Sequence, residues 1–400
     1  MATAGQAAAN GSASGRAAAQ MLQFFYVCYF VIVGVSTPFF GPYLRQIGLS
    51  GQSVSTLLAV APMLQIGVPL AWAWLSDRSQ QPQRVLSGLC LGACLASVPV
   101  VFVRTMPALL CLYFVQQVFA GSIGALADSI AVETARARRF DYTRIRLWGS
   151  FSFIATCLAM GKLLDLRAIK NGDPLVPALV SLAFGLSFLA SFRLAGNASW
   201  EAPRLRDVRM LLSNRRFRLL LTVSGLHWLC LSPFHGFFGI LLQDRGFPAT
   251  TTSYAFMVGS GAEILLFAIY ARLRARFGLA SLLAASFAIS AVHWWIVAYT
   301  RSALLVISTQ ALHALTFGLF WASCVAWIAE CVPPPLRATG QVLFSTALGL
   351  GAIVGFPVVG ALYDATRGAR VPFVAAGVVE LVPLSLVLLY CKNRPIEAAS

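Results

Sequence analysis

The feature that most constrains this chain is the recurrence of apolar runs about 20 residues long. A hydrocarbon core about 30 Å thick needs about 20 apolar residues of helix, at about 1.5 Å per residue, to cross it. Such runs recur from Met21 to Cys391. The pattern therefore predicts an all-α membrane protein with twelve transmembrane helices.

The composition excludes a water-soluble globule. Apolar residues make up 58% of the 400 positions and charged residues only 11%. This is too little polar surface to coat a soluble protein of that length, so lipid must be the solvent for much of the chain. The sequence also contains no nucleophile elbow, phosphate-binding glycine loop or metal-ligand spacing, and we therefore expect a protein that is not an enzyme.

Glycine, proline and charged clusters divide the apolar sequence into six spans on each side of a polar stretch rich in arginine. The predicted spans are 21–44, 53–75, 84–103, 107–133, 144–164, 175–194, 219–242, 251–271, 279–299, 303–330, 338–363 and 372–391. The predicted organisation is a disordered cytoplasmic tail at 1–20, an N-terminal six-helix bundle at 21–194, a cytoplasmic linker at 195–218, a C-terminal six-helix bundle at 219–391 and a cytoplasmic tail at 392–400.

The two halves have nearly equal length and share a faint repeat, which indicates duplication. An Arg-x-x-Gly string opens the fifth and the eleventh spans, and a Gly-x-x-x-Asp string closes both of them. The residues are Arg146 with Gly149, Gly161 with Asp165, Arg337 with Gly340, and Gly360 with Asp364. We expect two pseudo-symmetric bundles, in which glycines such as Gly349, Gly351 and Gly355 let helices approach closely.

The excess of Lys and Arg over Asp and Glu is explained by the predicted membrane topology. The net charge is +16, and most of the 30 Lys and Arg fall in segments that twelve spans place on the cytoplasmic side. This asymmetry follows the positive-inside rule with both termini in the cytoplasm, and no nucleic-acid partner is needed to explain it. The nine cysteines lie in apolar runs without a Cys-x-x-Cys string, so we expect no disulfide framework, metal or other cofactor.

Ionisable side chains inside the spans are the candidates for function. Each costs about 2.5–3.5 kcal/mol near the bilayer midplane unless a partner or water stabilises it, so several of them together indicate a cavity. The candidates are Asp128, Arg146, His227, His235, Glu263, His293, His313 and Glu380. They lie in both halves of the chain, as a central binding site requires. Glu133 and Glu330 lie near helix ends, where we expect them to pair with arginines.

Asp128 is the strongest candidate, because it follows a run of small residues that allows close approach. Its alternative role is a structural salt bridge to Arg146 or Arg144, and the two roles can coexist. The two arginines lie about 200° apart around a helix, so only one of them can face a cavity. We assign this position to Arg146 and expect Arg144 at the surface.

Glu263 lies in an otherwise apolar stretch, where a carboxylate suits a proton site, with a hydrogen bond to a neighbouring helix as the alternative. His227 and His313 are candidates for binding, with helix packing as the alternative. The spacing i, i+4, i+7 predicts that His313, Phe317 and Phe320 form one stripe. Such rings, together with Trp228, Phe234 and Trp321, can stack a ring-bearing cargo, although each can equally serve packing.

Several strings resemble those of a known family. They are Leu126 to Asp128, Asp141 to Ser150, Gly225 to His227, Ala262 to Glu263 and Leu312 to His313. Together they resemble the 3-phenylpropionate permease branch of the major facilitator superfamily, and the resemblance runs across nearly the whole chain from Met21. The pairing of an acid in the fourth span with an arginine in the fifth is also similar to lactose-permease-like sugar symporters.

The resemblance implies the major facilitator fold, a central cavity and proton-coupled uptake across the bacterial inner (plasma) membrane. It points to Asp128, Arg146, His227, Glu263 and His313 as cavity residues. We assign cargo contacts to Asp128, Arg146, His227, His313 and Phe317, and proton coupling to Asp128 or Glu263. The superfamily's loop signature between the second and third spans is reduced to Asp77 and Arg78, which are the candidates for a gating loop. The corresponding loop between the eighth and ninth spans has no acid.

We therefore predict a secondary active transporter that moves a small organic solute, with protons and the lipid bilayer as its other partners, and we expect a monomer. The cargo classes that fit are aromatic acids, nucleosides and sugar-like solutes. Proton-driven export of amphipathic compounds is the alternative within transport, and a membrane sensor that does not transport is the alternative from another class.

Overall fold

The computed structural model describes residues 2–138, 140–167, 173–194 and 205–392, and within these ranges it contains helices and no strand. Eleven helical stretches of the described chain are long and apolar enough to cross a membrane. They are Arg16–Gln46, Gly51–Ser79, Pro82–Val101, Met106–Arg138, Tyr142–Leu166, Arg215–Asp244, Ala249–Arg276, Leu279–Tyr299, Ala303–Cys331, Pro334–Thr366 and Arg370–Lys392. The shorter helix α8, Leu175–Ser191, occupies the remaining predicted span with 17 residues. The predicted all-α fold is confirmed.

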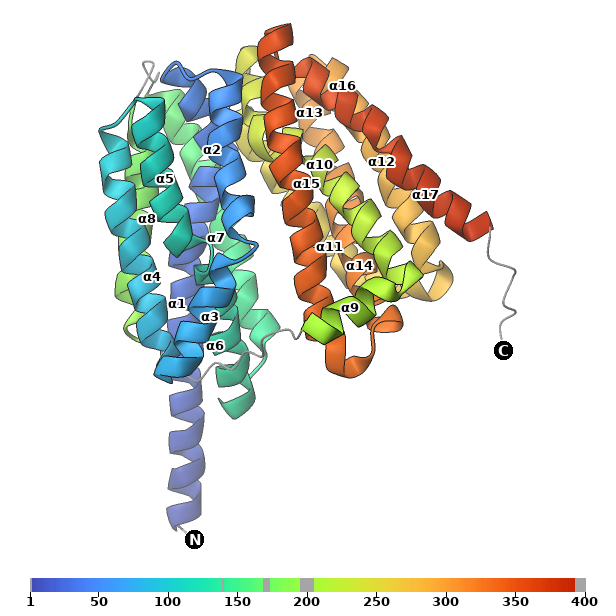
Figure 1. The fold of residues 1–400 in the computed structure, drawn as a ribbon. Helices are drawn as coiled ribbons and strands as arrows, with labels where there is room; N and C mark the ends of the chain where they lie inside the picture. Colours follow the sequence, from blue (N-terminus) through green and yellow to red (C-terminus); the bar gives the residue numbers. More distant parts are fainter. Residues whose placement is uncertain (1, 139, 168–172, 195–204, 393–400) are drawn as a thin grey trace. The chain divides into compact units, whose positions relative to one another are not determined.

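Several of these stretches consist of more than one helix (Figure 1). The first half of the chain contains α1 (Ala2–Gln46), α2 (Gly51–Leu64), α3 (Val68–Ser79), α4 (Pro82–Ser97), the 3₁₀ turn η1 (Val98–Val101), α5 (Met106–Ala120), α6 (Ile123–Arg138), α7 (Tyr142–Leu166) and α8. The second half contains α9 (Leu205–Ser213), α10 (Arg215–Asp244), α11 (Ala249–Arg276), α12 (Leu279–Tyr299), α13 (Ala303–Thr309), η2 (Gln310–Leu312), η3 (Ala314–Leu319), α14 (Phe320–Cys331), η4 (Pro334–Leu336), α15 (Arg337–Thr366), α16 (Arg370–Val379) and α17 (Leu381–Lys392).

The ends of the chain differ from the prediction where they are described. Residues 2–20 were expected to be disordered, but α1 begins at Ala2. Alanine has the highest intrinsic helix propensity, and the alanine-rich segment extends the apolar helix that follows it. Within the predicted linker, α9 covers Leu205–Ser213 and Asn214 caps α10 by accepting hydrogen bonds from the backbone of Arg216 and Phe217. Residues 195–204 and 393–400 lie outside the described residues.

Large apolar side chains remain exposed along the helices. Leu304 is 76% exposed, Leu265 is 70% exposed and Leu95 is 64% exposed. Such surfaces are costly in water, whereas lipid tails are as apolar as these side chains. The exposed faces therefore agree with helices that are surrounded by lipid.

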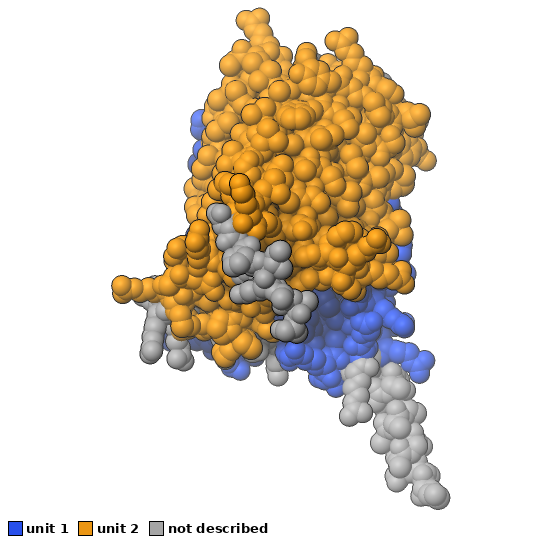
Figure 2. Space-filling model, turned by 90° about the vertical axis from the view of Figure 1, so that its right-hand side faces the viewer, with its two compact units in different colours: residues 1–47, 64–160, 169–201 blue, residues 48–63, 161–168, 202–400 orange. Residues whose placement is uncertain are grey.

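The chain forms two compact units that do not follow the two halves of the sequence completely (Figure 2). Unit 1 comprises residues 1–47, 64–160 and 169–201, and unit 2 comprises residues 48–63, 161–168 and 202–400. In unit 1, α4 and α8 pack on each other, and α1 packs on α8. The first half of the chain thus contributes most of α2 and the end of α7 to unit 2.

Unit 2 is organised around the packing of α10 on α15, which lie side by side in Figure 1. A Cβ atom on Gly351 would lie 2.1 Å from the carbonyl oxygen of Gly225, and one on Gly355 would lie 2.9 Å from that of Leu229. The two backbones can approach this closely only because these positions carry no side chain. The predicted packing role of Gly351 and Gly355 is confirmed.

The Gly-x-x-x-Asp repeat forms two equivalent contacts inside unit 2. Asp165 at the end of α7 accepts hydrogen bonds from the backbone N–H groups of Ala249 (2.7 Å) and Thr250 (3.0 Å), at the start of α11. Asp364 near the end of α15 accepts from Gly51 (2.7 Å) and Gln52 (2.8 Å), at the start of α2.

Each carboxylate thus satisfies two N–H groups that a helix N-terminus leaves unpaired, and its charge faces the positive end of the helix dipole. Gly161 and Gly360 make the approach possible, because a Cβ on either would lie about 2 Å from the hydroxyl of Ser253 or Ser55. The repeat in the sequence therefore encodes a repeated helix-capping contact.

We predict that Asp165→Ala and Asp364→Ala each destabilise the protein by about 0.5–2 kcal/mol, the usual cost of losing a helix cap, and that the two effects add. Thermal unfolding of the purified protein in detergent measures both. Glu133→Ala, which removes an exposed pair with Arg136, is the control and should change the melting temperature little. An unchanged melting temperature in both Asp variants would contradict the role of these caps.

Candidate functional site

In unit 1, Asp128 is held by side chains from two other helices. Tyr26 on α1 donates a hydrogen bond to Oδ1 of Asp128 at 2.5 Å, and Tyr142 on α7 donates to the same oxygen at 2.9 Å. The two phenols thus converge on one carboxylate oxygen. Gly124, one turn before Asp128 on α6, lies against Tyr29, so the small residues before Asp128 bring α6 close to α1.

Arg146 completes this cluster from α7. Its Nε lies 3.9 Å from Oδ1 of Asp128, and its guanidinium carbon lies 4.3 Å above the ring of Phe30. The side chains are 36% and 45% exposed, so the ion pair is long, solvated and worth at most about 1 kcal/mol. The cluster of Tyr26, Asp128, Tyr142 and Arg146, called here the Asp128 cluster, offers a carboxylate and a guanidinium that both remain accessible to a polar solute.

The two arginines of this segment take different positions. Arg144 is 86% exposed and lies 3.8 Å from Asp141, whereas Arg146 faces Asp128. Glu133 pairs with Arg136, and Glu330 pairs with Arg274 and with Arg216. Asp77 and Arg78 lie at the end of α3, where the Arg78 guanidinium lies over the Trp74 ring. The structure records no ion pair between Asp77 and another described residue.

In unit 2, the tenth span is broken where it carries its functional candidates. Helix α13 ends at Thr309, the 3₁₀ turn η2 and the π-helix η3 follow, and α14 begins at Phe320. His313 stands between η2 and η3. Short π segments in α-helices are rare and occur frequently at functional sites. Irregular backbone at membrane depth is tolerated only where protein or a water-filled cavity surrounds it.

Glu263 on α11 and His313 lie together in this region. Nε2 of His313 is 3.4 Å from Oε1 of Glu263, and the side chains are 10% and 20% exposed. Nδ1 of His313 is 3.2 Å from the hydroxyl of Thr316. A carboxylate beside an imidazole forms an ion pair when the ring is protonated and a neutral pair when the acid is protonated, so this contact can bind or release protons.

Aromatic rings continue the surface of His313. The ring of Phe317 is stacked on His313 at 5.6 Å between centroids, and the ring of Trp321 is stacked on Phe317 at 6.0 Å. Trp228 of α10 lies 5.9 Å from Phe317 and 6.3 Å from Trp321. We call His313, Phe317, Trp321 and Trp228 the aromatic row. The last three side chains are neither buried nor fully exposed, so each keeps surface that can contact a solute.

The predicted stripe of His313, Phe317 and Phe320 is wrong at its third member. Phe320 is fully buried, and its ring lies 4.3 Å from that of His227. The prediction assumed 3.6 residues per turn, but the π-helix η3 widens the turn between His313 and Phe320. The row therefore continues with Trp321, four residues after Phe317.

His227 lies away from any exposed surface. Its Nδ1 is 2.7 Å from Oε1 of Glu380, its Nε2 is 3.0 Å from the carbonyl oxygen of Thr316, and both His227 and Glu380 are 0% exposed. His227 was expected to contact cargo, but this burial gives a solute no access to it in the present conformation. His293 is also fully buried, and neither of its ring nitrogens has a hydrogen-bond partner among the described residues.

Sequence reasoning missed two tyrosines of these clusters, and it identified Glu380 as a candidate without assigning it a partner. Tyr26 lies 102 positions before Asp128, and no local pattern connects them. Tyr142 precedes Arg146 by four residues and so shares its helix face, which is a signal that could have identified it. Glu380 had no assigned role, although its position in an apolar span marked it as needing a partner.

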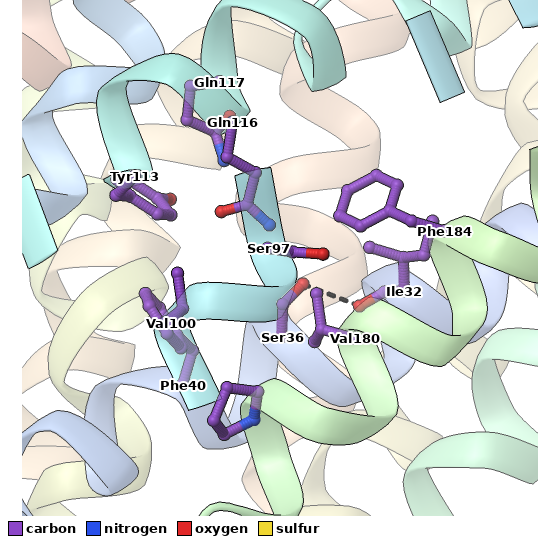
Figure 3. A pocket seen from close by; sticks show the side chains of 11 residues that line it. Ile32, Ser36, Phe40, Ser97, Val100, Tyr113, Gln116, Gln117, Val180 and Phe184 are labelled. Carbon is purple, nitrogen blue, oxygen red and sulfur yellow. Dashed lines mark hydrogen bonds between the residues drawn. The ribbon is translucent and has the colours of Figure 1, made fainter. Parts of the chain in front are cut away.

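The described residues also form a pocket inside unit 1 that contains none of the charged candidates. It lies among α1, the end of α4, η1, α5 and α8, and Figure 3 shows the amide of Gln116 beside Ser97, with Tyr113 and Phe184 on the walls. Ser36 at its edge donates its hydroxyl hydrogen bond to the carbonyl of Ile32. This pocket lacks an acid or a cation. Among the described residues, no group of three His, Cys, Asp or Glu could hold a metal ion.

Comparison with known proteins identifies the family. The model described as the MFS_1 like family matches residues 19–375. The maltose permease of Geobacillus stearothermophilus is 27% identical over 336 residues, which cover 82% of this chain and 83% of the relative. The "Probable 3-phenylpropionic acid transporter" of Escherichia coli (strain K12) is 25% identical over 348 residues, which cover 85% of this chain and 89% of the relative.

Solved structures support the same fold. The crystal structure of the nucleoside transporter NupG matches with a TM-score of 0.84 and 15% identity, covering 94% of this chain and 99% of that one. At this identity the likeness concerns the fold alone. The family match covers most of the chain, and the relatives are permeases and transporters, as the sequence predicted for a membrane protein that is not an enzyme. The chain is an integral membrane protein that belongs to the major facilitator superfamily of small-solute transporters, in its MFS_1 like family.

Proposed function

We propose that this transporter takes up a ring-bearing small organic solute together with a proton, by alternating access. The observation that carries the proposal is the contact of Glu263 with His313, a carboxylate and an imidazole 3.4 Å apart that are both only slightly exposed. A proton added to either group changes the charge of the pair. The pair lies next to the aromatic row, so the charge change and a bound ring would affect the same helix segment.

The coupling follows from the cost of burying charge. An ionised carboxylate that loses its water without gaining a cation is expensive in an apolar site, and protonation removes that cost. A carrier with Glu263 ionised therefore resists closure, and a protonated one closes with cargo bound. Asp128 is the alternative proton carrier, because its protonation would weaken the contact with Arg146 and leave that cation available to an anionic cargo.

The aromatic row favours a cargo with a planar ring. Phe317 and Trp321 are nearly parallel, with 19° between their planes, and Trp228 is tilted towards both. Stacking on such rings is tolerant of ring chemistry and contributes about 0.5–1.5 kcal/mol for each pair. The names of the similar proteins include a sugar, an aromatic acid and a nucleoside, so the similarity does not decide the class of cargo. We favour an aromatic acid or a nucleoside over a sugar-like solute.

The proposal includes the topology predicted from the sequence. The distribution of Lys and Arg supports cytoplasmic termini, and the relatives from bacteria support the inner membrane of a bacterium. Proton-driven export of amphipathic compounds remains the second candidate, because apolar cargo would also suit the aromatic row. The direction of cargo movement under an imposed pH gradient separates the two.

We predict that proteoliposomes of the purified protein accumulate one class among aromatic acids, nucleosides and disaccharides when the outside is acidic. With no membrane potential, about one pH unit supports about tenfold accumulation for each coupled proton. Asp128→Asn and Glu263→Gln keep the size of the side chain but not its titration, and the variant of the true proton carrier should lose accumulation.

Matched controls exist for both variants. Glu133→Gln changes an exposed acid on α6, the helix of Asp128, and Glu330→Gln changes an exposed acid in unit 2. Both should accumulate cargo as the wild type does. Unchanged accumulation in Asp128→Asn and in Glu263→Gln would sink the assignment of the proton carrier, and cargo extrusion would favour the exporter.

We further predict that Trp228→Leu and Phe317→Leu each weaken binding of the ring-bearing cargo by about tenfold, the loss expected for one aromatic contact. Binding to the protein in detergent can be measured by calorimetry. Phe277→Leu changes a half-exposed ring at the end of α11 and should leave the affinity unchanged. Equal affinities in all three variants would show that the aromatic row serves packing only.

A further inference from the structure

The most deeply buried ionisable pair of unit 2 lies outside the aromatic row and the contact of Glu263 with His313. His227 on α10 and Glu380 are both 0% exposed, and Nδ1 of the ring is 2.7 Å from Oε1 of the acid. Glu380 stands at the joint between α16 and α17, three residues before Pro383, whose nitrogen cannot donate a hydrogen bond to the preceding turn.

The hydrogen bonds of the ring fix how many protons the pair carries. Nε2 of His227 is 3.0 Å from the carbonyl oxygen of Thr316, and a carbonyl only accepts, so Nε2 carries hydrogen. Nδ1 and Oε1 at 2.7 Å must then share one further proton, either as imidazolium with carboxylate or as neutral imidazole with carboxylic acid. Without that proton, two lone pairs would face each other at hydrogen-bond distance, and the contact would open.

The second oxygen of Glu380 argues for a pair that is neutral overall. Oε2 has no hydrogen-bond partner among the described residues, although it is fully buried. The indole of Trp294 on α12 lies near the same carboxyl without meeting hydrogen-bond geometry, and its Nε1 is also unpaired within the described chain. A carboxylate left ionised without a cation could not remain in such a place, because one of its oxygens has nothing to stabilise it.

Among the described residues, no charged group other than its own partner is recorded as acting on Glu380. The electrostatic neighbours of the pair are Cys230 and His235 on α10 itself, His313 between η2 and η3, and Trp294 on α12. Helices α14 and α15 pack on α10 with Phe320 and small residues, and α11 reaches the region through Glu263, which is engaged with His313. The proton is therefore shared by His227 and Glu380 alone.

The two residues that His227 contacts both lie at irregular points of the backbone. Thr316 lies in the π-helix η3, and Glu380 lies at the joint of α16 and α17. Thr316 also contacts His313 through its hydroxyl at 3.2 Å, and His313 contacts Glu263. Thr316 thus stands between two acid–imidazole pairs, with its carbonyl on one and its hydroxyl on the other. A change in either pair would move the same turn of η3.

We propose that His227 and Glu380 form a second proton-carrying site of this transporter, which ties α10 to η3 and to the α16–α17 joint while its proton is present. Release breaks the O–H bond at Oε1 or the N–H bond at Nδ1, and the proton passes to water that enters when the joint opens. The remaining carboxylate is hydrated until a proton returns. This inference rests on the proton coupling proposed above and adds a site to it.

Glu380→Gln tests the proposal, because it preserves the contact and removes the titration. The glutamine amide can donate an N–H hydrogen bond to Nδ1 while Nε2 of His227 keeps its hydrogen. The variant therefore mimics the loaded site permanently. We expect exchange of labelled for unlabelled cargo to remain within about twofold of the wild type. Accumulation driven by a gradient of about one pH unit should fall by about tenfold for each proton no longer coupled. Glu330→Gln, with an exposed acid, is the control.

The outcomes separate the two proposals. Accumulation in the wild type with unchanged accumulation in Glu380→Gln overturns the second site and leaves the proposed function intact. No proton-driven movement of any cargo in the wild type overturns both.

If Glu380→Gln loses exchange as well, ¹⁵N NMR of the four histidines in the wild type decides. A His227 signal that keeps Nε2–H throughout, while the Nδ1 resonance shifts between about pH 5 and pH 10 as the proton shared with Glu380 is lost, supports the site. A spectrum of His227 that is constant over this range overturns it.

Discussion

A carboxylate placed among apolar helices needs a partner, since its isolated charge would cost more than the fold can supply. The acids of the described helices meet this requirement in different ways. Asp128 contacts two phenols and a guanidinium, Glu263 contacts the imidazole of His313, and Glu380 contacts the imidazole of His227. Asp165 and Asp364 take the free N–H groups of helix starts. The position of each acid therefore determines which helices must stay close.

The contacts of these acids differ in how they respond to protonation. A carboxylate that caps a helix holds its contacts for as long as it is ionised, and such a contact suits a fixed joint. A carboxylate beside an imidazole keeps its contact only while the two groups share a proton. Such a contact suits a segment that changes conformation during transport. Unit 2 contains both kinds, the caps at the starts of α2 and α11 and the acid–imidazole pairs on either side of Thr316. The irregular backbone occurs with the second kind.

Sequence patterns were sufficient to predict the fold and the ionisable members of the clusters, but not the partners that these residues contact. Hydropathy located the apolar helices, and the cost of inserting a charge into the membrane selected Asp128, Glu263, His313 and Glu380. Both quantities depend only on residue type and position along the chain. Partners from distant segments could not be predicted: Tyr26 and Asp128 meet only when α1 packs on α6. The stripe through Phe320 was wrong because helical periodicity cannot anticipate a π turn. The burial of His227 depends on Glu380, Phe287 and Phe320, which come from three other parts of the chain.

The central claim is that cargo and proton cross the membrane together. Its most direct test adds cargo to proteoliposomes without an imposed pH gradient and follows the external pH. The account predicts alkalinisation outside for a cargo that binds the protein, with the same initial rate in Glu133→Gln and none in the variant of the proton carrier. A cargo that enters the vesicles while the external pH stays constant would contradict it.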